Sequence, residues 1–205
     1  MTEKLLLATS NQAKVREYRS LLGSLPYELV TPAELNLTTT VSEVGESLEE
    51  NAKIKATAFA AASGLLSLAD DSGLEVDALG GEPGHLSARY AGEGVTDTER
   101  INYLLARLNG VPWEKRSARF RCVIAIARPD GEVALCSGEC PGLITFTPRG
   151  EQGFGYDPIF YLPELDKTMA ELPLELKNKV SHRGQAASKA RSVLQRLHEI
   201  KLKHN

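Results

Sequence analysis

A pair of strand-like segments joined by a tight turn constrains the fold of this chain more than any other feature. The segment from Ala118 to Ala127 alternates in part between apolar and charged side chains, as strands do. Pro129-Asp130-Gly131 then predicts a turn, so residues 133–139 should pair with the first segment as a long hairpin. The fold must therefore contain antiparallel strands.

Strand, turn and helix signals elsewhere predict α/β units. Residues 4–9 form a short apolar run typical of a buried strand, with Ser10 and Asn11 as candidate N-caps of a helix that ends at Gly23. A capping box at residues 47–50 starts a second helix that ends at Gly64. We expect residues 65–69 to form the next strand, with an acidic turn at Asp70-Asp71-Ser72-Gly73.

Further helices are expected from a capping box at residues 96–99, from Thr168 to Glu171, and from Ser181 onward with its main body at residues 185–201. Residues 150–157 form a glycine-rich loop. Together with the hairpin, these elements predict an α/β fold with an elongated central mixed β-sheet flanked by helices. No linker is rich enough in Pro, Gly or Ser to separate domains, so residues 1–205 are expected to form a single domain.

Composition excludes several classes of protein. The chain has 205 residues and a formal net charge of −3, which disfavours a sequence-independent nucleic-acid binder. No segment reaches the roughly 20 apolar residues of a membrane span, and the first apolar run is too short for a signal peptide. Three cysteines without a CxxC pair favour buried thiols over a disulfide framework or a zinc site, as expected in a reducing cytoplasm.

The pair Asp70-Asp71 is the sharpest candidate for chemistry. Ligands of α/β folds bind outside the carboxyl ends of strands, where this pair is expected. Two adjacent carboxylates repel each other unless a cation or proton intervenes. Magnesium prefers such oxygens and takes one or two protein carboxylates together with substrate phosphates. The alternative is a solvated turn leading to Gly73.

A second candidate is the polar turn Thr9-Ser10-Asn11-Gln12-Ala13-Lys14. The N–H groups and dipole of a helix N-terminus attract phosphate, and a lysine stands in the first turn. The turn lacks the glycine frame of a Walker A loop. An ordinary N-cap with a surface lysine is the alternative.

Two segments near the C-terminus could recognise a base. The glycines of Gly153-Phe154-Gly155-Tyr156-Asp157 let the backbone approach a ligand, and the aromatic ring between them could stack on a base. Lys177 could contact phosphate, and the arginine of the cluster Ser181-His182-Arg183-Gly184 could contact the oxygen acceptors of a purine. A tight loop with a core phenylalanine and a charged surface are the alternatives.

Taken together, these segments resemble the inosine triphosphate pyrophosphatase family, whose members hydrolyse ITP, dITP and XTP. The resemblance rests on blocks in the family's order along nearly the whole chain: residues 6–14 (LLATSNQAK), 49–52 (EENA), 69–79 (ADDSGLEVDAL), 87–92 (SARYAG), 153–160 (GFGYDPIF) and 181–186 (SHRGQA). Ser10 stands where the family commonly has glycine, and Ser42 stands where it often has an acidic residue.

The resemblance implies two lobes with a cleft between them, a homodimer, a magnesium requirement and release of pyrophosphate from the triphosphate substrate. It implies that Asp71 is the general base and, with Glu43, a metal ligand. The implied substrate contacts are Thr9, Ser10, Asn11, Gln12, Ala13, Lys14, Lys55, Ser72, Phe154, Gly155, Tyr156, Asp157, Lys177, His182 and Arg183.

Two other functions stay open from the sequence. A sister group of similar fold acts on modified pyrimidine or methylated nucleotides, although residues 154–157 and 181–186 are of the purine type. A non-catalytic nucleotide-binding module is the other alternative, and the presence of Asp71 and Lys14 argues against it.

Overall fold

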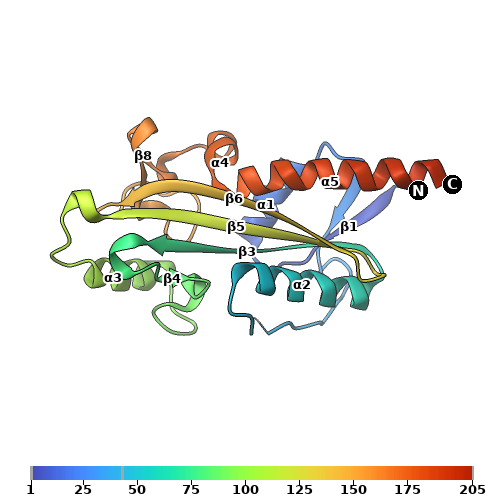
Figure 1. Ribbon diagram of the computed structural model, residues 1–205, viewed down its shortest axis with the longest axis horizontal. Coiled ribbons are helices and arrows are strands. Elements are labelled where there is room, and N and C mark those ends of the chain that lie inside the picture. Colours follow the sequence, from blue (N-terminus) through green and yellow to red (C-terminus); the bar gives the residue numbers. More distant parts are fainter. Residues whose placement is uncertain (1, 43, 205) are drawn as a thin grey trace. The chain divides into compact units, whose positions relative to one another are not determined.

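The computed structural model describes residues 2–42 and 44–204, which form a mixed sheet with helices on its faces (Figure 1). Glu43, one of the two expected metal ligands, lies outside the described residues. The strands are β1 (Glu3–Leu7), β2 (Tyr27–Val30), β3 (Leu66–Val76), β4 (Pro83–Gly84), β5 (Ser117–Ala127), β6 (Val133–Ile144), β7 (Phe160–Leu162) and β8 (Lys167–Thr168). The helices are α1 (Gln12–Leu22), α2 (Leu48–Ser63), α3 (Asp97–Arg107), α4 (Leu174–Val180) and α5 (His182–His204).

The sheet contains both parallel and antiparallel pairs, as the sequence predicts. Its order is β2-β1-β3-β5-β6-β7-β8, with β4 paired to β3. β1 is parallel to β2 and to β3, whereas β4, β7 and β8 pair antiparallel with their neighbours. The predicted turn between β5 and β6 is closed by the Gly131 N–H, which donates to the Arg128 carbonyl over 3.0 Å.

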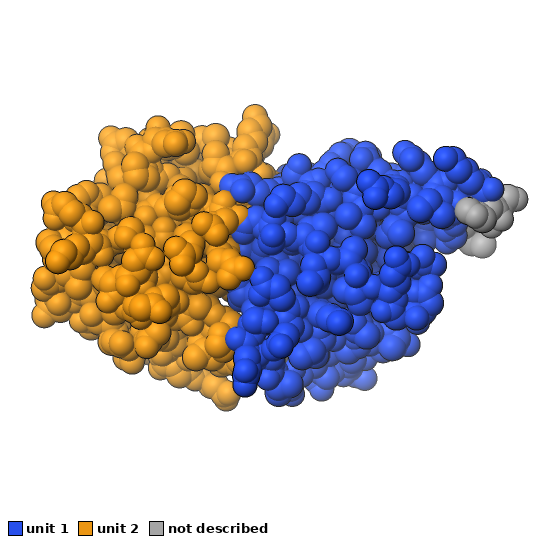
Figure 2. Space-filling model, viewed as in Figure 1, with its two compact units in different colours: residues 1–71, 122–138, 183–205 blue, residues 72–121, 139–182 orange. Residues whose placement is uncertain are grey.

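The chain divides into two compact units, coloured separately in Figure 2. Unit 1 comprises residues 1–71, 122–138 and 183–205, and unit 2 comprises residues 72–121 and 139–182. β3, β5 and β6 each contribute residues to both units. A single domain with a cleft between lobes stays a prediction.

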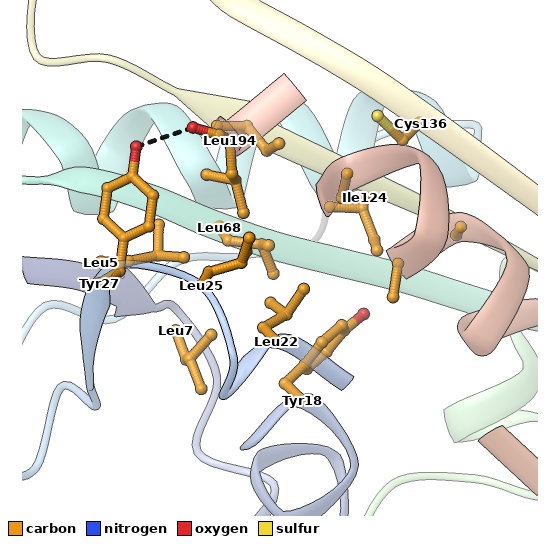
Figure 3. Close-up of a cluster of buried hydrophobic side chains, with 14 of the residues drawn as sticks. Leu5, Leu7, Tyr18, Leu22, Leu25, Tyr27, Leu68, Ile124, Cys136 and Leu194 are labelled. Carbon is orange, nitrogen blue, oxygen red and sulfur yellow. Dashed lines mark hydrogen bonds between the residues drawn. The ribbon is translucent and has the colours of Figure 1, made fainter. Parts of the chain in front are cut away.

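Unit 1 has an apolar core on each face of its strands. Leu68, Cys122 and Ile124 pack with α1 and α5 in one cluster, part of which is drawn in Figure 3. Val123 and Ala125 pack with α2 in the other cluster. Because successive strand residues point to opposite faces, a strand covered on both faces is apolar without interruption.

Unit 2 uses the first half of β5 differently. Phe120 packs in its core, while Arg119 and Arg121 point to the other face and both pair with Glu75 of β3, at 2.7 and 3.1 Å. This change from a half-polar to a fully apolar strand explains why the alternation in the sequence is only partial.

The expected acidic turn at residues 70–73 is wrong, because β3 runs without interruption from Leu66 to Val76. Asp and Gly disfavour strands on average, but tertiary contacts override this preference. Here the two carboxylates are buried beside lysine and arginine side chains, which removes the need for a solvated turn.

Helix starts follow the sequence signals with three differences. Ser47 caps α2, but the Glu50 carboxylate accepts from the Glu46 N–H instead of completing the box. Residues 169–171 form only one 3₁₀ turn, because Pro173 disfavours helical backbone before it. The last helix begins at His182, ahead of the expected main body. No helix in the described part of the chain is long and apolar enough to cross a membrane.

Candidate active site

The turn between β1 and α1 is an N-cap exposed to solvent. The side-chain oxygen of Asn11 accepts from the N–H groups of Ala13 and Lys14 over 2.9 and 3.2 Å, so Asn11 is the N-cap, one of two predicted candidates. Thr9 accepts from the Asn11 N–H over 3.2 Å and thereby shapes the turn. Ser10 and Gln12 are exposed. The turn is thus accessible to a ligand, and phosphate binding by it stays a prediction.

Asp70 and Asp71 contact different cations, because neighbouring strand residues point to opposite faces of a sheet. Asp70 Oδ1 lies 3.0 Å from Lys14 Nζ of α1. Asp71 Oδ1 lies 3.6 Å from Lys55 Nζ of α2. Since α1 and α2 pack in the clusters on opposite faces, Lys14 and Lys55 each have their own carboxylate.

Asp70 also belongs to a buried chain of charges. Its Oδ2 accepts from Nε and Nη2 of Arg183 over 3.2 and 3.3 Å, and Arg183 Nη1 donates to Glu17 over 2.7 Å. Arg183 is only 1% exposed, so in this structure its guanidinium is bonded inside unit 1. Direct contact between Arg183 and a substrate stays a prediction.

The surrounding charges keep this network ionised. Burial favours the neutral acid, but the charges of Lys14, Arg183 and Lys55 outweigh it and hold the pKa of Asp70 below its usual range. Burial likewise opposes the charge of Arg183, yet Asp70 and Glu17 raise the pKa of this guanidinium well above its usual value. The neighbouring Cys122 thiol is neutral at physiological pH, because burial and the Asp70 charge raise its pKa to about 12.

In unit 2, the glycine-rich loop is folded around a buried ion pair. Lys177 Nζ lies 2.6 Å from Asp157 Oδ2, which also accepts from the Phe154 N–H over 2.9 Å. The same ammonium lies 4.9 Å from the centroid of the Phe154 ring. Gly153 has a φ of +78°, a conformation that favours glycine. The structure therefore brings together three of the residues predicted to contact the substrate: Phe154, Asp157 and Lys177.

The rest of the loop is anchored to its surroundings. The Gly155 N–H donates to Asp97 over 2.6 Å. Tyr156 is buried and its hydroxyl donates to the Ser87 carbonyl over 3.0 Å, so its ring belongs to the core of unit 2. His182 stacks on Phe120 with ring centroids 4.7 Å apart and is also buried. Ser72, the remaining predicted contact in unit 2, is partly buried.

Sequence reasoning missed the residues that hold the candidates in place, namely Glu17, Asp97 and Phe120. Glu17 follows Lys14 by three residues in α1, which places both on one helix face, but spacing does not show that the face is buried. Asp97 stands inside the capping box of α3, where an acidic residue has an ordinary structural explanation. Phe120 looks like any other core residue of a strand.

The donor set at Asp71 fits a magnesium ion. Asp71 offers hard carboxylate oxygens beside a lysine, and magnesium needs only one or two such ligands when phosphates and water complete its shell. Within residues 2–42 and 44–204 no group of three His, Cys, Asp or Glu side chains could hold a metal by itself. A metal at Asp71 would therefore need ligands beyond the described side chains, either Glu43, which lies outside them, or oxygen atoms of the substrate.

Comparison with known proteins identifies the family. Residues 5–193 match the Ham1 family. The dITP/XTP pyrophosphatase of Desulforamulus reducens is 52% identical over 195 residues, covering 95% of this chain and 97% of that protein. The dITP/XTP pyrophosphatase of Bacillus subtilis is 46% identical, covering 93% and 96%.

Solved structures agree with this match. A HAM1 protein from Coxiella burnetii superposes with a TM-score of 0.86 at 42% identity, covering 95% of this chain and 99% of that one. The Staphylococcus aureus Ham1 protein superposes with a TM-score of 0.84, also at 42% identity, covering 94% and 98%. The resemblance noted in the sequence is confirmed, and the chain belongs to the Ham1 family.

Proposed function

We propose that this protein hydrolyses deaminated purine nucleoside triphosphates, namely ITP, dITP and XTP, to the nucleoside monophosphate and pyrophosphate. The observation that carries the proposal is the arrangement of two carboxylates on β3, each beside one lysine, in a chain that matches dITP/XTP pyrophosphatases over most of its length. The lysines supply charge for a polyphosphate, and Asp71 supplies a base.

The phosphates would bind the residues of unit 1. Lys14 and Lys55 are partly buried, so their charges are less screened by solvent than those of surface lysines. The turn from Thr9 to Ala13 adds the positive end of the α1 dipole. These groups would neutralise the triphosphate and stabilise the pyrophosphate as it leaves.

Asp71 would orient a water molecule and take its proton during in-line attack on the α-phosphorus. Its carboxylate is buried and lies beside Lys55, which keeps it in place. Asp71 and Glu43 would hold a magnesium ion, which would neutralise phosphate charge when bound. Positioning and electrostatic stabilisation account for most of the acceleration in reactions of this type.

The base would bind the residues of unit 2. Phe154 offers an aromatic face, and Lys177 offers N–H donors beside it. A 6-keto oxygen accepts from such donors, whereas the amino group of adenine leaves them unpaired, and this mismatch discriminates strongly. Since guanine also has a 6-keto group, its rejection must depend on the 2-position. A homodimer and a cytoplasmic location stay predictions.

The test is pyrophosphate release from ITP, XTP, dITP, dUTP, ATP and GTP, each with magnesium and with EDTA. We expect rapid release from ITP, XTP and dITP, slow release from ATP and GTP, and none in EDTA. Equal rates for ITP, XTP, ATP and GTP would refute the proposed specificity. Preference for a pyrimidine would indicate the sister group, and binding without release would indicate a non-catalytic module.

A further inference from the structure

We propose that Asp70 is a positioning residue that fixes Lys14 for the triphosphate, while its neighbour Asp71 alone carries the base. The inference rests on the proposed function and divides the acidic pair into two separate roles. Side chains alternate between the two faces of β3, so the carboxylates of Asp70 and Asp71 contact lysines from different helices.

Both oxygens of Asp70 are engaged by cations. Oδ1 lies 3.0 Å from Lys14 Nζ, and Oδ2 accepts two bonds from Arg183. The Asp70 side chain is 1% exposed, whereas that of Lys14 is 14% exposed. A metal at Asp70 would have to displace one of these cations, whereas the ammonium of Lys14 still reaches the surface.

Arg183, which donates to the Asp70 carboxylate, is itself bonded to a second carboxylate. Arg183 Nη1 donates to Glu17 over 2.7 Å, and both side chains are buried. Charges therefore alternate from Glu17 through Arg183 and Asp70 to Lys14, and only the last is partly exposed. Because Glu17 and Lys14 belong to α1, Asp70 to β3 and Arg183 to α5, the network connects Lys14 to two further elements of unit 1.

A fixed ammonium has a consequence for the reaction. A lysine side chain has a flexible four-carbon stem, and ordering it during the reaction costs rotamer entropy. Lys14 is ion-paired with Asp70, and its ammonium N–H groups can donate to phosphate oxygens. Asp70 would thus supply preorganisation, which acts on the rate. Its negative charge does not favour phosphate binding, so neutralising it should not weaken the affinity for the substrate.

The test is a double-mutant cycle of Asp70→Asn and Lys14→Met with steady-state kinetics on dITP. With Lys14 present, we expect Asp70→Asn to lower kcat about 10- to 100-fold with KM unchanged or lower, in line with the cost of a misplaced group. In the Lys14→Met background it should lower kcat by less than about threefold, because residues that act as a unit are non-additive. Equal fold-losses in both backgrounds would overturn the inference.

A matched control is Glu17→Gln, which removes the other carboxylate from Arg183 without touching Lys14. We expect it to lower the thermal midpoint as Asp70→Asn does, but to lower kcat by less than Asp70→Asn, because Asp70 still contacts Lys14 and the glutamine oxygen can still accept from Arg183 Nη1. A loss of kcat as large as that of Asp70→Asn would show that the network acts through stability alone and would contradict the inference.

Two further measurements cover the remaining outcomes. The magnesium concentration for half-maximal rate should be the same in Asp70→Asn and the unmutated enzyme, and an increase would assign Asp70 to the metal instead. If Asp70→Asn does not fold, the cycle is repeated with Asp70→Glu, which retains the charge but displaces it by one methylene. This variant should lower kcat only when Lys14 is present.

An unmutated enzyme that releases no pyrophosphate from dITP would overturn the proposed function and the inference together, whereas an active enzyme with additive losses would overturn only the inference.

Discussion

Replacing Lys177 with methionine should destabilise unit 2 strongly, because it leaves the Asp157 carboxylate buried without its cation. The two side chains are 3% and 4% exposed and their charged atoms lie 2.6 Å apart. At an effective dielectric constant of 20, this separation corresponds to a gross attraction of about 6 kcal/mol. The desolvation penalty offsets part of it, and removal of one partner from such a pair costs about 3–5 kcal/mol.

Urea unfolding followed by circular dichroism measures this cost. The control is the double variant Lys177→Met with Asp157→Asn, in which the asparagine can still accept from the Phe154 N–H. Because no charge remains buried, we expect the double variant to be at least about 2 kcal/mol more stable than Lys177→Met alone. If the double variant is as unstable as the single one, or less stable, the ion pair does not support the loop as described.

Three other predictions follow from particular contacts. Burial raises the pKa of Tyr27 to about 12, so its contribution to stability is complete below about pH 10 and is lost as the pH rises through 12. Tyr27→Phe should therefore flatten the alkaline decline in unfolding free energy by up to about 1.4 kcal/mol per pH unit, and an unchanged slope would contradict this. Gly64 ends α2 with a φ of +68° and open space where a Cβ would stand, so Gly64→Ala should cost about 1–2 kcal/mol of stability from the backbone alone. The same stability in both proteins would show that this left-handed cap is not required. Hydrolysis of dITP in ¹⁸O-labelled water should place the label in the monophosphate, as mass spectrometry can determine, and label in pyrophosphate would exclude attack on the α-phosphorus.

Much of the fold follows from local signals in the sequence. Asn11 caps α1, Gly64 ends α2, and the box at Thr96 and Glu99 starts α3, because each of these contacts joins residues that are close along the chain. The hairpin of β5 and β6 follows from a turn and two apolar segments for the same reason.

The structure around Asp70 and Asp71 cannot be predicted from local signals in the sequence. Asp70-Asp71-Ser72-Gly73 has the composition of a turn, yet it continues a strand because cations distant in sequence neutralise the carboxylates. The bond between Arg183 and Glu17 joins residues 166 positions apart, and no local pattern predicts it. Most of the predicted substrate contacts follow from local motifs, and Lys55 follows from the resemblance, whereas the residues that hold these contacts could be found only from three-dimensional contacts.

The role of Asp71 as general base is tested most directly by the initial rate of pyrophosphate release from dITP with saturating magnesium, measured for the unmutated enzyme and for Asp71→Asn. Loss of a general base typically costs about 10²–10⁴-fold in rate. We expect a decrease in this range for Asp71→Asn, in a variant that still folds and binds dITP. A rate near that of the unmutated enzyme would contradict the role of Asp71 and the mechanism built on it.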